Sequence, residues 1–332
     1  MGSGTGAFRS GVRAGCVAVA LPLFLVAGAR AQSTKMPSTL RYGSGLWDVP
    51  VASVLPHLAA TATYSGFALD VDGDAVVDEA GDAVGTGPPV DQWNSDVSLA
   101  VGLFDRIEAG ATFQSFADEN SGGTMAGGFG RLLLLRPGPS GGFGLAGGLR
   151  FVSAPSFDDA DPRIDFQPGR LGFPDRRLRE SYAGKGDVNT VWSPYLVASA
   201  VLPGFDTRLL PTHDVTLTLG RGGGIFSGGE GLDDWYGPDS SGGWFFGGAV
   251  HARVGETAVV NLVGDYNGFD VNLGAQVDVG GVRIGGYVLG LNHGENAGRY
   301  RSRKAGLLAS VAVCPIRGGL CRAELLERSE PD

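Results

Sequence analysis

Apolar and polar residues alternate with a period of two in three consecutive segments near the end of the chain. In the middle segment, Phe269, Val271, Leu273, Ala275 and Val277 alternate with Asp270, Asn272, Gln276 and Asp278. Successive side chains of a strand point to opposite faces, so this pattern predicts a strand with one apolar and one polar face. Asn267-Gly268 and Gly280-Gly281 separate the three segments, and these residues accept the positive φ of tight turns. The three segments therefore predict an antiparallel meander.

Similar segments recur along the chain and bring the expected number of strands to about twelve. The others cover residues 57–70, 92–103, 107–116, 124–136, 142–154, 188–202, 212–226, 243–254 and 304–313. Short connections such as 104–106 alternate with long ones such as 155–187. Bacterial outer-membrane barrels show this arrangement, with short turns at one rim and long loops at the other.

Lipid offers no hydrogen-bond partners to a strand, so a sheet that spans a membrane must close on itself and turn its apolar face outward. A soluble two-sheet sandwich would also alternate, but it gives no reason for short and long connections to segregate. We expect an all-β fold, an antiparallel up-and-down transmembrane β-barrel of about 12 strands, in the bacterial outer membrane.

The polar face of these strands is then expected to line the lumen. The lumen-lining candidates are Gln92, Asn94, Asp96, Glu108, Gln114, Arg150, Thr216, Thr218, His251, Arg253, Asn261, Asp265, Asp270, Asn272, Gln276, Asp278 and Arg283. Both charge signs are present. A lumen of this size is either a narrow wet channel or is closed by its own ion pairs and inserted segments.

The sequence also predicts a leader peptide, and its net charge disfavours nucleic acid as a partner. Residues 1–31 combine Arg9 and Arg13, a largely apolar run and Ala29-Arg30-Ala31, which predicts a cleaved signal peptide. The full chain carries a net charge of −9, which disfavours nucleic acid as a partner. We expect a periplasmic segment at 32–56, the barrel at 57–313 and a periplasmic tail at 314–332. Glycine is unusually frequent, at 57 of 332 residues.

Two cysteines remain after removal of the leader. Cys314 and Cys321 bracket six residues, and in an exported protein this spacing favours a disulfide over a metal site, which would need further ligands nearby. Two free thiols are the alternative.

An acidic loop follows the first predicted strand. Asp70, Asp72, Asp74 and Asp78 stand at positions 1, 3, 5 and 9 of a calcium-binding loop. The loop departs from that pattern at Ala75, where a glycine is expected, and at Gly81, where the final acid is expected. It is either a weak calcium site or a solvated acidic loop, and no other cofactor is expected.

Basic residues gather before the last predicted strand. Arg299, Arg301, Arg303 and Lys304 could contact the phosphates of lipopolysaccharide, or they are ordinary charges at the rim. The four histidines stand in no recognisable catalytic pattern. We therefore expect no enzyme, although an outer-membrane lipase whose catalytic residues meet across strands is a less favoured alternative.

Two motifs carry a resemblance to a known group. Gly43-Ser-Gly45-Leu46 followed by Pro50-Val-Ala52 resembles the opening of the exopolysaccharide-associated outer-membrane barrels, which read G-x-x-G-L-I-x-x-P-T-A. The stretch 265–272, DYNGFDVN, resembles their E-Y-D-G-x-D-x-N hairpin, which is also seen in related porin-like proteins. The resemblance implies a passive channel or an accessory to export of an envelope polysaccharide.

A plugged barrel that serves as a structural or surface-interaction protein is the alternative function. The expected partners are outer-membrane lipid, lipopolysaccharide and a small solute or polysaccharide.

Overall fold

The computed structural model describes residues 40–71, 75–77, 83–86, 90–117, 122–138, 141–152, 156–157, 191–205, 213–226, 242–255, 258–268, 270–292, 303–315 and 319–321. The chain divides into two compact units, 1–30 and 31–332, and every described residue belongs to the second. The predicted leader and most of the predicted tail lie outside the described residues. No helix in the described part is long and apolar enough to cross a membrane, a finding that does not bear on crossing by strands.

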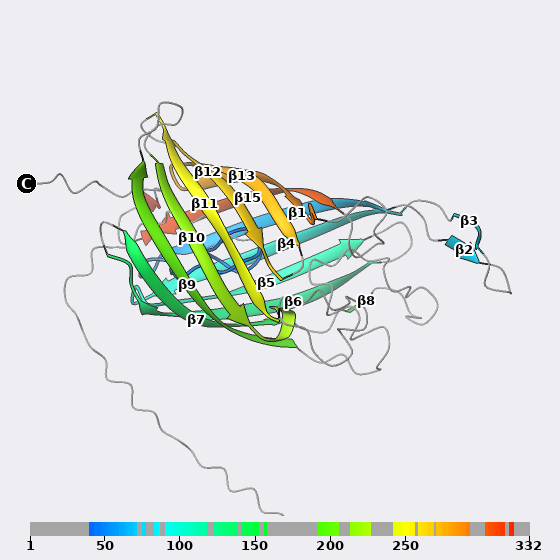
Figure 1. The fold of residues 1–332 in the computed structure, drawn as a ribbon, viewed down its shortest axis with the longest axis horizontal. Helices are drawn as coiled ribbons and strands as arrows, with labels where there is room; N and C mark the ends of the chain where they lie inside the picture. Colours follow the sequence, from blue (N-terminus) through cyan, green and yellow to red (C-terminus); the bar gives the residue numbers. More distant parts are fainter. Residues whose placement is uncertain are drawn as a thin grey trace, which may run out of the picture. The chain divides into compact units, whose positions relative to one another are not determined.

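Twelve strands form a closed barrel. They are β1 (Ala60–Val71), β4 (Val90–Leu103), β5 (Ile107–Ala117), β6 (Gly122–Leu135), β7 (Gly142–Val152), β9 (Val191–Phe205), β10 (His213–Gly222), β11 (Trp244–Val254), β12 (Ala258–Tyr266), β13 (Val271–Val279), β14 (Val282–Leu289) and β15 (Lys304–Cys314). Each pairs antiparallel with its neighbours in chain order, and β1 also pairs with β15 (Figure 1). The predicted fold is confirmed.

Among the described residues, four short strands and one short helix are additional to the twelve strands of the barrel. β2 (Ala75–Val77) and β3 (Ala83–Thr86) pair only with each other, β8 (Ser156–Phe157) pairs with β6, and β16 (Gly319–Leu320) pairs with β15. The 3-10 helix η1 (Gly224–Phe226) follows β10. Some predicted boundaries are wrong: β1 begins at Ala60 instead of His57, β9 ends at Phe205 instead of Leu202, and β10 ends at Gly222 instead of Phe226.

The two faces of each strand differ as the alternation predicts. In β13, Val271, Leu273 and Val277 are exposed, whereas Asn272, Gln276 and Asp278 are buried. In β4, Val97, Leu99 and Val101 are exposed while Asn94, Asp96 and Ser98 are buried. The apolar side chains therefore point outward and the polar ones point into the lumen.

The barrel has two distinct rims because consecutive strands are antiparallel. Connections 104–106 and 280–281 lie at the rim where β1 begins, which we call the short-turn rim. The strand ends that are joined by residues 153–190 and 223–243 lie at the opposite rim, which we call the long-loop rim. This segregation agrees with the pattern expected from the sequence.

Residues 40–59 lie inside the barrel, and we call them the plug. All of them are buried except Leu58 and three half-buried residues. The prediction that 32–56 is a segment outside the barrel is therefore wrong for residues 40–56. The apolar side chains of the plug explain the error, because Leu46, Trp47 and Val49 join one buried cluster with inward-facing wall residues such as Val263 and Tyr287.

Candidate functional site

The plug folds into a tight loop around Trp47. Gly45 and Pro50 form an antiparallel bridge, and the Leu46 amide donates to the Val49 carbonyl at 2.9 Å. The Leu40 amide donates to the Trp47 carbonyl at 3.0 Å. These bonds satisfy part of the backbone locally, and the wall must satisfy the rest because buried backbone groups need partners.

Trp47 anchors the loop on one side of the lumen. Its side chain is fully buried, its indole Nε1 donates to the Val263 carbonyl at 3.1 Å, and its ring lies 5.1 Å from that of Tyr287. A Cβ added at Gly274 would stand 2.5 Å from the indole Cζ2. It would also stand even closer to the Gly286 carbonyl oxygen of β14, so the wall needs a glycine there because a side chain would meet both the indole and the neighbouring strand.

Glu108 on β5 binds two backbone amides of the plug. Its Oε1 accepts from the Ser44 amide at 2.7 Å, and its Oε2 accepts from the Leu55 amide at 2.9 Å. Gly43 precedes this contact with a φ of 76°, and a Cβ there would stand 2.7 Å from the Phe129 ring. One fully buried carboxylate thus holds two distant points of the plug.

Arg131 on β6 binds the carbonyls beside those amides. Its Nη1 donates to the Ser44 and Ser53 carbonyls at 2.7 and 2.9 Å, and its Nε donates to the Tyr195 hydroxyl at 3.1 Å. Arg131 faces Glu108 directly across the β5–β6 register. This pair of opposite charges holds both donors and acceptors of the plug backbone, and we call it the Glu108–Arg131 clasp.

Asp48 joins the two motifs that carried the sequence resemblance. Its amide donates to Asp265 Oδ2 at 2.9 Å, and its Oδ2 accepts from Asn267 Nδ2 at 2.7 Å. Asn272 Nδ2 donates to the other oxygen of Asp265 at 2.7 Å. The opening motif and the 265–272 hairpin are more than 200 residues apart in sequence, and here they form one polar contact.

Further wall groups complete the hold on the plug. The Ala52 amide donates to Ser199 Oγ at 2.9 Å, and Ser199 Oγ donates to Thr218 Oγ1 at 2.9 Å. Arg41 lies 3.2 Å from Asp48 Oδ1 and 3.8 Å from Asp96 Oδ2. The plug therefore contacts the wall through both uncharged hydroxyls and ion pairs.

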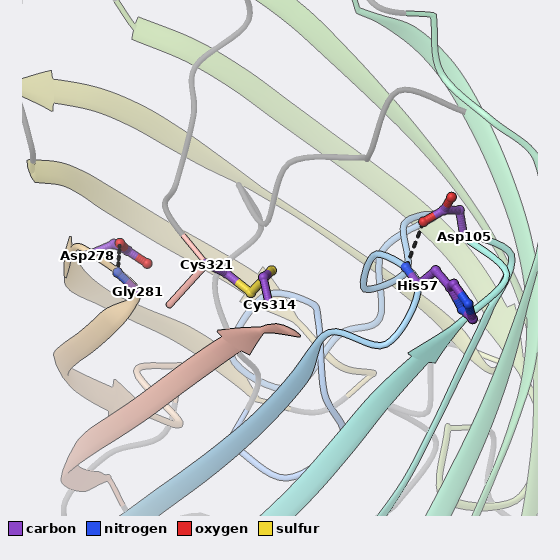
Figure 2. The surroundings of a disulfide bond; sticks show 6 residues. All are labelled: His57, Asp105, Asp278, Gly281, Cys314 and Cys321. Atoms are coloured by element: carbon purple, nitrogen blue, oxygen red, sulfur yellow. Dashed lines mark hydrogen bonds between the residues drawn. A yellow bond between two sulfur atoms is a disulfide. The ribbon is translucent and has the colours of Figure 1, made fainter. Parts of the chain in front are cut away.

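The plug leaves the lumen at the short-turn rim. The His57 amide donates to Asp105 Oδ1 at 2.7 Å, as Figure 2 shows, and the Phe104 amide donates to His57 Nδ1 at 3.0 Å. The two rings stack at 5.4 Å. His57 thus fixes the tight turn 104–106, in which Phe104 and Asp105 both have positive φ.

The disulfide lies at the same rim. Cys314 and Cys321 are joined by an S–S bond with a Cα–Cα distance of 5.0 Å (Figure 2). Nearby in Figure 2, the Gly281 amide donates to Asp278 Oδ1 at 3.2 Å. Arg283 Nε donates to the other oxygen of Asp278 at 2.6 Å.

Most candidate lumen residues are buried on the inward face. They are Asn94, Asp96, Glu108, Gln114, Arg150, Thr216, Thr218, His251, Asn261, Asp265, Asp270, Asn272, Gln276, Asp278 and Arg283. Arg253 is exposed near the end of β11, so it does not line the enclosed lumen. Gln92 lies in β4, but its side chain is outside the described part. The sequence predicted these positions well, but the alternation did not show that several of them bind a plug.

A second polar group spans three neighbouring strands. Thr216 Oγ1 lies 3.0 Å from His251 Nε2, and His251 Nδ1 lies 2.6 Å from Asn261 Oδ1. The order hydroxyl, imidazole, amide is that of a hydrolase triad. However, all three side chains are buried on the inward face and bond to one another, so we interpret the group as a hydrogen-bonded part of the wall.

The side chains expected to bind calcium, and half of the expected basic cluster, lie outside the described residues. Asp72, Asp74 and Asp78 lie outside the described residues, as does the side chain of Asp70. Among the described residues, no group of three or more His, Cys, Asp or Glu side chains could hold a metal ion. Arg299 and Arg301 also lie outside the described part, and Arg303 is exposed.

The predicted contact with lipopolysaccharide is wrong for Lys304. It is buried and points inward, because exposed Arg303 and Ala305 flank it on the outward face of β15. Lys304 therefore cannot join an outward cluster of basic residues.

The helix η1 was missed by the sequence analysis. Its Ile225 and Phe226 turn into the lumen near the long-loop rim, where Phe226 packs 4.7 Å from Phe245 and 5.8 Å from Tyr195. The glycines at 222–224 end the period-two pattern and were the available signal for this inward turn.

Comparison with known proteins adds only a likeness of fold. No family model and no curated protein matches the sequence. Outer membrane phospholipase A from Escherichia coli is 12% identical with a TM-score of 0.36, covering 77% of this chain and 96% of that one. An outer membrane channel from Pseudomonas putida F1 is 10% identical with a TM-score of 0.37, covering 80% and 99%. A FadL homologue from Pseudomonas aeruginosa is 10% identical with a TM-score of 0.32, covering 86% and 98%. Likeness at this level carries no argument about function.

Proposed function

We propose that this chain is an outer-membrane β-barrel kept closed by its own plug, and that it serves the cell envelope as a structural or surface-interaction protein. Its partners are outer-membrane lipid and lipopolysaccharide. The long-loop rim faces outside the cell and carries the contacts to other molecules.

Membrane insertion is supported by the outward face. Leu99, Leu273, Ile284 and Leu307 are each more than half exposed although they are apolar. A soluble barrel that left such side chains in water around its circumference would lose the hydrophobic free energy that drives folding. The exposed Trp93, Trp192 and Trp244 stand at the starts of β4, β9 and β11, near the long-loop rim. Aromatic side chains prefer the lipid–water interface, as in the girdles of membrane barrels.

The Glu108–Arg131 clasp is the observation that carries the closed state. Two buried, oppositely charged side chains use their polar atoms on the plug backbone instead of on water or solute. Removing the plug would break these four hydrogen bonds at once, and water entering the lumen would have to replace them. The closed state is therefore favoured in the absence of another ligand.

Conductance of the refolded full-length protein in planar bilayers tests this proposal. We expect no regular steps from the wild type. Glu108→Gln should produce openings, because an amide NH₂ cannot accept from a backbone N–H. Asp278→Asn is the matched control, since Asp278 is an equally buried inward carboxylate that binds Gly281 and Arg283 instead of the plug.

A passive channel, or an accessory to polysaccharide export, is the second candidate. It is favoured by the polar character of the hold on the plug, because water or a solute can replace hydrogen bonds to Ser199, Asp265 and Arg131. Discrete conductance steps from the wild type would select this candidate and contradict the closed barrel.

A further inference from the structure

Arg150 on β7 is a buried cation, and only part of its guanidinium forms hydrogen bonds. Its side chain is 1% exposed. Its Nη1 donates to the Asp48 carbonyl at 3.0 Å and lies 3.9 Å from Asp48 Oδ1. All of these contacts use one nitrogen of the guanidinium.

Aromatic rings surround this guanidinium. Its Cζ lies 4.3 Å from the ring centroid of Tyr42, 5.1 Å from that of Phe226 and 5.8 Å from that of Tyr195. Such contacts stabilise the positive charge but accept no strong hydrogen bond from the N–H groups. A further hydrogen-bond partner for Arg150 must therefore approach in the plane of the guanidinium.

One edge of Arg150 stays without a partner. Among the described residues, neither Nε nor Nη2 of Arg150 has a hydrogen-bond acceptor, although both atoms are buried. Nearby Arg131 differs, because its Nε, Nη1 and Nη2 all donate to the Tyr195 hydroxyl or to plug carbonyls. Buried donors of this kind call for a water or an ion.

The geometry of the edge points to an oxyanion. Nε and Nη2 lie side by side on the guanidinium and present two parallel N–H bonds, which match the two oxygens of a carboxylate, sulfate or phosphate. Asp48 does not supply these oxygens: its carboxylate is held by Asn267 at 2.7 Å and Arg41 at 3.2 Å, and it lies 3.9 Å from Nη1 of Arg150 without bonding to Nε or Nη2.

We propose that the Nε–Nη2 edge of Arg150 binds an oxyanion group of an acidic solute that enters the lumen. The site combines a forked donor pair with the aromatic rings of Tyr42, Tyr195 and Phe226. The inference goes beyond the closed barrel: Arg150 is 1% exposed, so the solute displaces neighbouring side chains to reach it, whether or not the barrel conducts.

Calorimetric titration of the refolded full-length protein with selenate tests the site. We expect saturable binding by the wild type and binding at least about tenfold weaker by Arg150→Gln, because charge-assisted hydrogen bonds are lost. Arg283→Gln is the matched control, since Arg283 is an equally buried lumen arginine that is already bound to Asp278. Equal affinities of Arg150→Gln and the wild type, or no saturable binding by the wild type, would overturn the proposal.

A measurement on the wild type alone covers the case in which Arg150→Gln does not fold. Anomalous diffraction from crystals soaked in selenate should show selenium within hydrogen-bond distance of both Nε and Nη2. A water molecule at that edge, with no selenium, would contradict the site. Competition with glucuronate separates two sources: displacement of selenate identifies a sugar acid, and persistence of selenate identifies an inorganic oxyanion.

Discussion

The outward and inward faces of the same strands are stabilised by different kinds of contact. Outward Leu273 and Ile284 present apolar surface that any lipid chain can cover. Inward Glu108 and Arg131 each bind particular backbone atoms of the plug. The outward face should therefore accept any apolar side chain, whereas the inward face depends on individual residues.

Replacing a tryptophan by alanine should give the largest difference between the two faces, because Trp47 packs inside the barrel and Trp93 points outward. Trp47→Ala removes a fully buried indole that packs on Tyr287, and such truncations cost about 3–5 kcal/mol. Trp93→Ala removes an outward indole that is 46% exposed, so it should cost clearly less. Urea unfolding in lipid vesicles, followed by gel mobility, measures both. Equal shifts of the two midpoints would contradict the assignment of the faces.

A charge on the outward face should have the next largest effect. Leu273→Arg places an arginine against lipid and should cost roughly 2–4 kcal/mol near the middle of the bilayer. Leu273→Phe is the control and should fold with the wild-type yield. The folding yields of both variants in lipid vesicles check the expectation. Asn272 would be a poor control, because it binds Asp265 and the Gly290 amide.

Two neighbouring glycines sharpen the comparison further. Gly274→Ala points inward and should cost about 1–3 kcal/mol through overpacking against Trp47. In Gly264→Ala the new Cβ would meet Leu273 Cδ1 at 3.5 Å and the Asn272 carbonyl oxygen at 3.6 Å, and both are ordinary contacts. The free energies of unfolding of both variants, measured in the same vesicles, should differ accordingly. A neutral Gly274→Ala would mean that both the indole and the backbone of β14 at Gly286 can move aside.

The smallest effect is expected at the disulfide, which lies at the short-turn rim, at the end of β15. Replacing Cys314 and Cys321 together by serine opens a loop of sequence separation 7. A loop this short should contribute about 2 kcal/mol or less. Unfolding of the double variant measures the effect, and mass spectrometry without reductant should find the linked peptide in wild-type protein from the envelope. Alkylation of both thiols without reductant would contradict the bridge.

The wall of the barrel could be predicted because its signal is local. In each alternating segment the apolar residues identify the outward face. The inward positions Asp96, Asn261 and Gln276 therefore followed directly from their sequence neighbours. The same rule would have placed Lys304 inward, because Leu307 points outward three residues later. Grouping Lys304 with Arg303 by charge, without regard to parity, caused that error.

The plug could not be predicted because its order comes from distant residues. Residues 40–56 have no period, and their partners lie far away in sequence, 64 residues from Ser44 to Glu108 and 216 from Trp47 to Val263. Nothing local shows that the Ser44 amide needs a carboxylate. The apolar content of Leu46, Val49 and Val51 was the available signal, since a segment exposed to water has little use for it.

The plug also has a mechanical role. Its loop is tied to β5 and β6 through Glu108 and Arg131, and to β12 through Val263 and Asp265. These strands stand on opposite sides of the ring, since four strands separate β6 from β12 in one direction and five separate β12 from β5 in the other. The plug is thus a cross-brace, and the barrel cannot flatten into an oval under lateral pressure without stretching hydrogen bonds on both sides of its lumen.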